Sequence, residues 1–311
     1  MLGYIARRVL VAIPTILVII TVAFFMMRAA PGGPFDLERP MPEEVRQNVL
    51  AHFGLDRPIH EQYVDYLGNL VQGDLGPSLK FRDKTVADII SEGFPVSATI
   101  GGLSILLALF LGSLLGSIAA LRQNKAGDFA VMGVAMAGIT IPPFVMGPIL
   151  ALVFGLYLGL VPTGGLDPRY GMTAERLILP VITLALPQIA IISRLMRASM
   201  IEVLRSNYIR TAYAKGLSGP VVIARHALRA AVLPLVSYLG PASAALVTGS
   251  IVIEQVFQLP GIGRQFVTAA LQRDYTVVMG VVILYATLII TLNLIADLLY
   301  ATLNPKVKID A

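Results

Sequence analysis

VSATIGGLSILLALFLGSLLGSIAAL, residues 96–121, has no charged side chain in 26 residues. A helix needs about 20 apolar residues to cross a hydrocarbon core of about 30 Å, so this run can span a membrane. Five further charge-free runs lie at 9–27, 129–166, 177–193, 230–253 and 275–296, of which 177–193 is the shortest. We therefore predict an all-α polytopic membrane protein with six transmembrane helices.

The composition agrees with this class. The chain is 56% hydrophobic and 14% charged, whereas a soluble domain carries about 25% charged residues. A net charge of +5 could suggest nucleic acid in a soluble protein, but an excess of Lys and Arg in cytosolic loops explains it here. We expect the lipid bilayer as a partner and no nucleic acid.

Several kinds of chemistry are excluded by the sequence. The chain has no cysteine, so it can form neither a disulfide nor a thiolate metal site. It has no G-x-x-x-x-G-K-[ST] loop, so we expect it not to bind ATP by itself. His52 and His60 lie among acidic residues without metal-ligand spacing. We predict no catalytic residues, no metal and no cofactor.

The charges of two loops set the topology. Residues 122–128 and 194–229 are both basic, so both are predicted to be cytosolic with an even number of crossings between them. We therefore interpret 129–166 as one long span near 131–158, rather than two short helices hinged at Ile141-Pro142-Pro143, followed by an external turn at 159–165. Both chain termini are then cytosolic.

The predicted domains follow from these spans. Residues 1–28 form a cytosolic tip and the first helix, which we take as retained and not as a cleaved signal peptide. Residues 29–95 form an external, periplasmic insertion of short helices, which we expect to pack on the membrane domain or on a partner. Residues 96–303 form the transmembrane core, with a cytosolic loop at about 199–232, and residues 304–311 form a cytosolic tail.

Start and stop signals place the short helices of the insertion. Pro42 can open a helix that stops before Gly54, and Asp56 can cap a second helix that opens near Pro58 and ends at Gly73. Thr85-Val86-Ala87-Asp88 resembles a capping box, in which a Thr side chain and an acid three residues later each bond the other's backbone.

Acidic residues are nearly missing from the predicted spans. Asp297 is the only one, near the cytosolic end of the last span, where we expect it to pair with an Arg or a helix end. Gradient-driven transporters usually carry intramembrane acids, so their scarcity favours energy from another source. Gly112 and Gly116 allow close helix packing in lipid, either within the chain or at a subunit interface.

The basic loop contains a short helix of unusual composition. Seven of the 24 basic residues fall between Arg194 and Arg229. We predict a helix from Tyr208 to about Lys215, with Ser206 or Asn207 as its cap and Gly216 as the left-handed residue that ends it. Ser218 or Gly219 then caps a second helix with Pro220 in its first turn. A short helix with small side chains in its middle can fit a groove on another protein.

These residues resemble a known family. Tyr208–Leu217, Arg225–Arg229 and Leu233-Pro234 resemble the coupling loop of ABC-transporter permeases of the dipeptide/oligopeptide/nickel branch. Further stretches resemble the same branch: 30–32, 53–58, 73–78, 141–144, 259–263, 273–275 and 304–306. Residues 25–28, 77–80, 94–98 and 199–204 resemble its oligopeptide members in particular. Two departures are Tyr213, where relatives usually carry Arg, and Gly219-Pro220, where they carry a basic pair.

The resemblance implies a type I ABC importer permease fold and a multi-pass permease subunit for oligopeptides in the inner membrane. It implies three kinds of partner: a second homologous permease, two cytosolic ATP-binding subunits that hydrolyse ATP, and an external peptide-binding protein. The ATPase-coupling residues would be Tyr208, Arg210, Thr211, Ala212, Lys215, Gly216 and Leu217. A permease for dipeptides, glutathione or nickel, and a gradient-driven secondary transporter, remain as alternatives. No substrate-binding residues are assigned.

Overall fold

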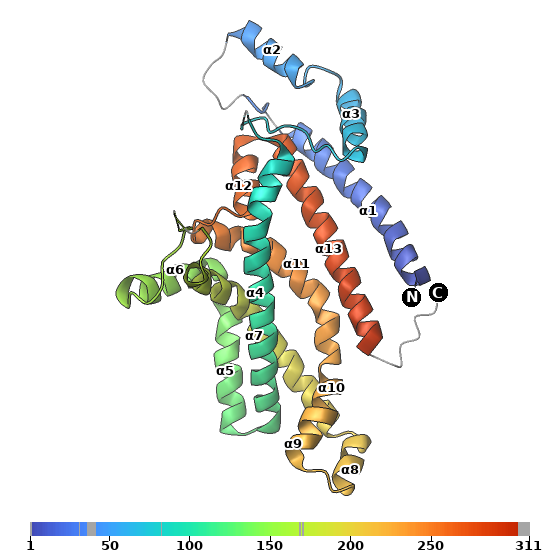
Figure 1. Cartoon of the computed structure of the whole chain (residues 1–311), viewed down its shortest axis with the longest axis vertical. Helices are drawn as coiled ribbons and strands as arrows, with labels where there is room; N and C mark the ends of the chain where they lie inside the picture. The colour runs from blue at the N-terminus through green and yellow to red at the C-terminus, as the bar shows by residue number, and fades with distance from the viewer. Residues whose placement is uncertain are drawn as a thin grey trace.

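A computed structural model of the chain describes residues 2–30, 32–35, 42–81, 83–167, 169 and 171–303. In these ranges the chain folds into helices and contains no strand, only two isolated bridges, Pro77–Thr85 and Asp167–Gly171. Figure 1 shows a bundle of long helices with a small helical region at one end. The predicted all-α class is confirmed. The predicted tail 304–311 lies outside the described residues.

Four helices are long and apolar enough to cross a membrane alone: α1 (Leu2–Ala29), α4 (Val86–Leu121), α7 (Ala174–Leu204) and α13 (Tyr275–Leu303). Two pairs of bent helices are also long and apolar enough to cross a membrane when each pair is taken as one segment, one over 126–157 and one over 219–244. Counting each pair as one span gives the predicted six.

The straight span predicted near 131–158 is wrong. The chain forms α5 (Ala126–Thr140), α6 (Pro143–Leu150) and a π-helix, η1 (Ala151–Tyr157), with a bend of 104° at the hinge. Pro142 and Pro143 supply no backbone N–H, and the residue before a proline avoids the α conformation, as Ile141 does with φ −93° and ψ 119°. Because α5 and α7 both run along the bundle, loop 122–125 and the end of α7 still lie at the same end (Figure 1).

The insertion contains two of the predicted helices. Helix α2 (Glu43–His52) begins after Pro42, and α3 (Ile59–Val71) begins after Pro58. The residue that caps α3 is Pro58, which is adjacent to the helix, and not Asp56 as predicted.

The capping box is confirmed, but it opens a longer helix. The Asp88 N–H donates to the Thr85 hydroxyl (3.2 Å), and the Thr85 N–H donates to the Asp88 carboxylate (2.9 Å). Helix α4 then continues for 36 residues through Pro95. The domain boundary predicted at residue 95 therefore falls inside α4.

Several contacts hold the insertion against the spans, among them those of Asp274 and Arg28. Asp274, fully buried just before α13, accepts hydrogen bonds from the Ser78 hydroxyl and from the Leu79 N–H (3.2 Å). Arg28 at the end of α1 donates to Gln62 of α3 (2.9 Å) and stacks over the Phe24 ring at 3.8 Å. The insertion therefore packs on the membrane part of its own chain.

The other ends of α1 and α13 are also joined. Asp297 accepts hydrogen bonds from Arg8 (2.5 Å) and from the Tyr4 hydroxyl (3.0 Å). The prediction that Asp297 pairs with an arginine is confirmed.

Helices α4 and α7 approach closely through two glycines. Gly112 and Gly116 are buried, and a Cβ at either position would overlap α7 at Ile192 or at the Ser193 carbonyl. These glycines therefore pack within the chain, which settles the alternative that the sequence left open. Gly133 on α5, by contrast, faces open space.

We predict that Gly116→Ala destabilises the α4–α7 pair by about 1–3 kcal/mol, since overfilling a packed core forces the backbone to shift. The thermal unfolding midpoint of the purified permease in detergent measures this. Gly133→Ala is the matched control, because its new Cβ meets no atom within 4 Å. Equal midpoints for the two variants would contradict the packing described here.

Candidate coupling surface

The loop after α7 folds at the end of the molecule farthest from the insertion (Figure 1). It contains α8 (Asn207–Ala214), α9 (Gly219–Val221), a π-helical segment η2 (Val222–Ala227) and α10 (Leu228–Ala231), and leads into α11 (Leu233–Val256). The predicted short helix is confirmed, with its start one residue earlier. Ser206 occupies the N-cap position, but its hydroxyl donates to the Val203 carbonyl (2.6 Å).

Helix α8 ends as the sequence predicts. Gly216 has φ +80°, its N–H donates to the Tyr213 carbonyl (2.9 Å), and the Leu217 N–H donates to the Ala212 carbonyl (3.4 Å). This pair of bonds is the Schellman motif, which satisfies the last carbonyls of a helix. A Cβ on Gly216 would meet no atom within 4 Å, so glycine is favoured there by backbone conformation and not by crowding.

The inner face of α8 is apolar and buried. Ile209 is 1% exposed and Ala212 is 7% exposed, and both belong to one buried cluster with Met200 of α7, Val222 of η2 and Ala231 of α10. Ala212 therefore faces the chain's own core, and we assign it a positioning role in place of the predicted direct contact with an ATPase.

The other six predicted residues lie on the exposed sides of α8 and on its C-terminal end. Tyr208 is 46% exposed and Leu217 is 37% exposed; Arg210, Thr211, Lys215 and Gly216 are exposed as well. Arg210 and Lys215 form no ion pair with any residue that the structure describes. The Thr211 hydroxyl donates to the Asn207 carbonyl (3.1 Å), which leaves its methyl group available for contact.

A buried ion pair braces the base of this surface, and sequence reasoning missed it. Asp128 at the start of α5 is 1% exposed and accepts two hydrogen bonds from Arg197 of α7, at 2.7 and 2.5 Å. The Asn124 N–H donates to the same carboxylate (2.9 Å). In the sequence, the signal for this pair is one acid, Asp128, at the edge of a basic loop. The charges of that loop were used above only to predict its side of the membrane.

A second contact connects the α4–α5 turn to the segment after α7. Arg205, at the junction of α7 and α8, donates to the Gln123 side chain (3.1 Å). The α4–α5 turn and the segment that carries α8 are therefore linked directly. Buried on one side and exposed on the other, α8 is suited to transmit force between a partner and the spans.

Two family models match the chain over most of its length. Residues 112–309 match the model described as binding-protein-dependent transport system inner membrane component. Residues 1–100 match the N-terminal model of membrane components of the same systems.

Individual proteins agree with this match. The chain is 49% identical over 308 residues to the oligopeptide transport system permease protein OppB of Haemophilus influenzae, covering 99% of this chain and 100% of that protein. It is 42% identical over 309 residues to the dipeptide transport system permease protein DppB of Bacillus subtilis, covering 99% of each.

A crystal structure of an amino acid ABC transporter with histidines has a similar fold, with a TM-score of 0.50 at 15% identity over 69% of this chain and 94% of that chain. From the family models and the full-length relatives, we conclude that this chain belongs to the family of inner membrane components of binding-protein-dependent transport systems, the permease subunits of ABC importers.

Proposed function

We propose that this chain is one membrane-spanning half of an ATP-driven importer for oligopeptides, with its coupling surface and both termini in the cytosol. The observation that carries the coupling role is the geometry of α8, whose inner face is buried in its own subunit while its outer face is exposed and positively charged. The substrate class rests on the relatives, since the oligopeptide permeases are 49–50% identical and the dipeptide permeases 36–42% identical.

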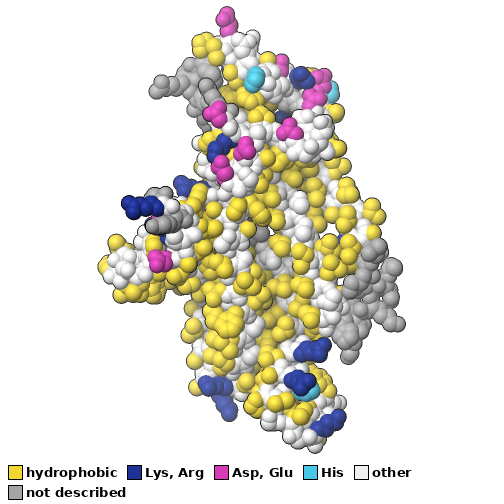
Figure 2. Space-filling model, viewed as in Figure 1, with side chains coloured by type: hydrophobic (Ala, Val, Ile, Leu, Met, Phe, Trp, Pro, Cys, Tyr) yellow, Lys and Arg dark blue, Asp and Glu magenta, His cyan; other side chains and the backbone are white. Residues whose placement is uncertain are grey.

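The distribution of charge supports the orientation. Asp and Glu side chains gather at the insertion end of the molecule, whereas Lys and Arg gather at the end that carries α8 (Figure 2). Cytosolic loops of membrane proteins are enriched in Lys and Arg. We therefore propose that residues 29–95 lie on the periplasmic side, the loop 199–232 in the cytosol and the core 96–303 in the membrane.

The proposed complex contains a second homologous permease, two cytosolic ATP-binding subunits and an external peptide-binding protein. The ATP-binding subunits are required because this sequence has no phosphate-binding loop. The contacts with them would be Tyr208, Arg210, Thr211, Lys215, Gly216 and Leu217. Large apolar side chains on α5 and η1 are exposed, with Val134 at 76% and Leu156 at 69%, and in this proposal they face the lipid or the second permease.

In the proposed mechanism, closure of the ATPase dimer moves α8. Because Ile209 and Ala212 share one buried cluster with α7, η2 and α10, displacement of α8 is transmitted to the spans. The Asp128–Arg197 pair and the close α4–α7 contact carry the displacement to α4 and α5. The bundle then rocks as a unit, which is the rigid-body form of coupling between distant sites.

Reconstitution tests the function. The permease, its partner subunits and the binding protein are placed in vesicles, and uptake of peptides from two to about six residues is measured. We expect uptake to require ATP, to persist with an uncoupler and to favour peptides longer than two residues. Uptake that survives ATP depletion but not an uncoupler would point to a secondary transporter, and a preference for dipeptides would correct the substrate class.

We predict that Gly216→Val lowers peptide uptake at least tenfold while ATP hydrolysis continues, because a β-branched residue in left-handed geometry costs about 1–2 kcal/mol or more and distorts the end of α8. Parallel assays of hydrolysis and uptake measure this. Gly73→Val is the matched control: Gly73 also has φ +80° and open space, but it lies in the insertion. Normal transport by Gly216→Val would refute the assigned role.

We predict that Tyr208→Ala weakens binding of the ATP-binding subunits by about tenfold, since an exposed aromatic anchor at an interface is typically worth 1–3 kcal/mol. The dissociation constant in detergent measures this. Phe81→Ala is the control, because Phe81 is 40% exposed and lies in the insertion, at the opposite end of the molecule from α8 (Figure 1). An unchanged dissociation constant for Tyr208→Ala would remove Tyr208 from the contact surface.

A further inference from the structure

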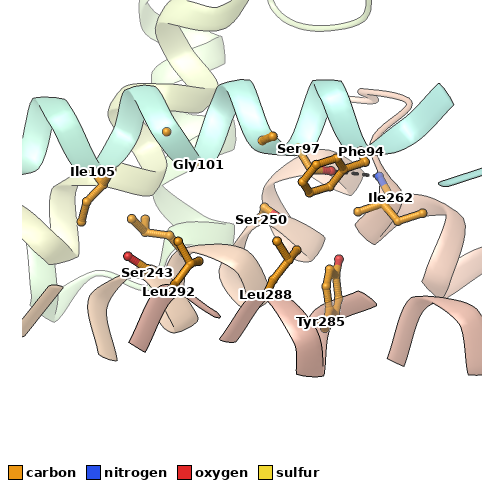
Figure 3. A pocket seen from close by; sticks show the side chains of 13 residues that line it. Phe94, Ser97, Gly101, Ile105, Ser243, Ser250, Ile262, Tyr285, Leu288 and Leu292 are labelled. Carbon is orange, nitrogen blue, oxygen red and sulfur yellow. Dashed lines mark hydrogen bonds between the residues drawn. The ribbon is translucent and has the colours of Figure 1, made fainter. Parts of the chain in front are cut away.

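A cavity of about 220 Å³ lies between α4, α11 and α13, away from the coupling surface. Figure 3 shows side chains from these helices converging on it. Its apolar lining includes Phe94 and Ile105 of α4, Leu246 of α11, and Leu288 and Leu292 of α13. Gly101 also lines the cavity, and a Cβ there would meet no atom within 4 Å. The space beside α4 is therefore open and is not filled by the chain's own side chains.

One hydrogen-bonding group faces this cavity without a partner. The Tyr285 side chain is 8% exposed, and its hydroxyl is buried with no hydrogen-bond partner in the part of the chain that the structure describes. Figure 3 shows this hydroxyl pointing into the cavity. A buried donor without an acceptor costs free energy, so an acceptor on a ligand would be favoured there.

The neighbouring polar groups are already engaged. The Ser97 hydroxyl donates to the Glu254 carboxyl (2.6 Å) and accepts from the Ile262 N–H (2.9 Å). Glu254 itself is fully buried and also accepts from the Arg264 N–H (3.0 Å). Ser243, which donates to the Leu239 carbonyl (2.7 Å), and Ser250, which bonds Glu254, also line the cavity and are engaged. The Tyr285 hydroxyl is therefore the free donor that the described residues offer a ligand, and the rest of the wall is apolar.

The free hydroxyl lies toward one end of the cavity, which we call the polar end, and the other end is mainly apolar, with the engaged Ser243 beside Leu292 (Figure 3). Phe94 and Ser97 lie toward the start of α4, on the insertion side, and Ile105 lies deeper. Phe94 and Ile105 are about 16 Å apart along the helix at 1.5 Å per residue. Helix α4 is about 54 Å long, so a hydrocarbon core of about 30 Å centred on it begins about eight residues in, near Phe94. The polar end thus lies near the outer boundary of the hydrocarbon layer and the apolar end near its middle.

We propose that this cavity binds an acyl chain of an ester-linked lipid from the outer leaflet, with the ester carbonyl accepting a hydrogen bond from Tyr285. The polarity and direction of the cavity match such a chain. A peptide segment fits poorly, because it brings two backbone polar groups per residue to a wall with one free donor.

Photolabelling of the complete transporter tests this. The complex is reconstituted in vesicles of phosphatidylglycerol and phosphatidylethanolamine that include a phosphatidylethanolamine with a diazirine on its acyl chain. After illumination, mass spectrometry locates the adducts. We expect adducts on Ile105, Leu288 and Leu292 in the wild-type chain.

Two variants separate filling of the cavity from loss of the hydrogen bond. Gly101→Leu should fill the cavity and reduce these adducts about tenfold, and Tyr285→Phe should reduce them about fivefold, as expected for one lost hydrogen bond. Gly133→Leu is the control, because Gly133 also has open space, on α5. Retained ATPase activity and subunit composition exclude misfolding as the cause.

Three results would overturn the proposal: no adducts on the three residues in the wild-type chain, equal labelling of Gly101→Leu and Gly133→Leu, or labelling of the isolated permease that disappears in the complete complex. The last result would show that a partner subunit, and not a lipid, occupies the cavity.

Discussion

Burial of the inner face of α8 is the contact on which the proposed coupling depends. A helix of eight residues is too short to be stable alone in water, because isolated helices shorter than about 12–15 residues are marginal. Ile209 and Ala212 anchor it in a cluster formed with α7, η2 and α10. The same burial that keeps α8 folded also attaches it to the spans, so stability and force transmission have one physical origin.

Two features make the attachment stiff. The buried Asp128–Arg197 pair has two short hydrogen bonds and a third from a backbone N–H, which fixes the α4–α5 turn against α7. Gly116 allows α4 to lie directly on the α7 backbone. The segment that carries α8 is therefore continuous, through direct contacts, with α4, α5 and α7.

Much of this could be predicted from the sequence because it depends on local patterns. Charge-free runs gave the spans, the Thr85–Asp88 spacing gave the capping box, and Gly216 gave the end of α8. The hinge at Ile141-Pro142-Pro143 was weighed and wrongly rejected, because loop charges fix only the parity of crossings, which a helix lying across the bundle leaves unchanged.

Long-range pairings were harder to see in the sequence. Asp128 with Arg197 and Glu254 with Ser97 join residues separated by 69 and 157 positions. Likewise, the face of α8 that is buried depends on where η2 and α10 lie. Small side chains at Thr211, Ala212 and Ala214 suggested one common surface, whereas the fold places Ala212 inside and the other two outside.

The most direct measurement of the central claim is a distance between spin labels on α8 and α4 in the complete transporter. The chain has no cysteine, so Ala214→Cys and Leu121→Cys, both exposed, place the only two labels on this chain, and the partner subunits are used in cysteine-free form. We predict that this distance stays the same with and without ATP, while the labelled complex still imports peptide. A distance that changes with ATP would show that α8 swings independently of the bundle and would contradict the account.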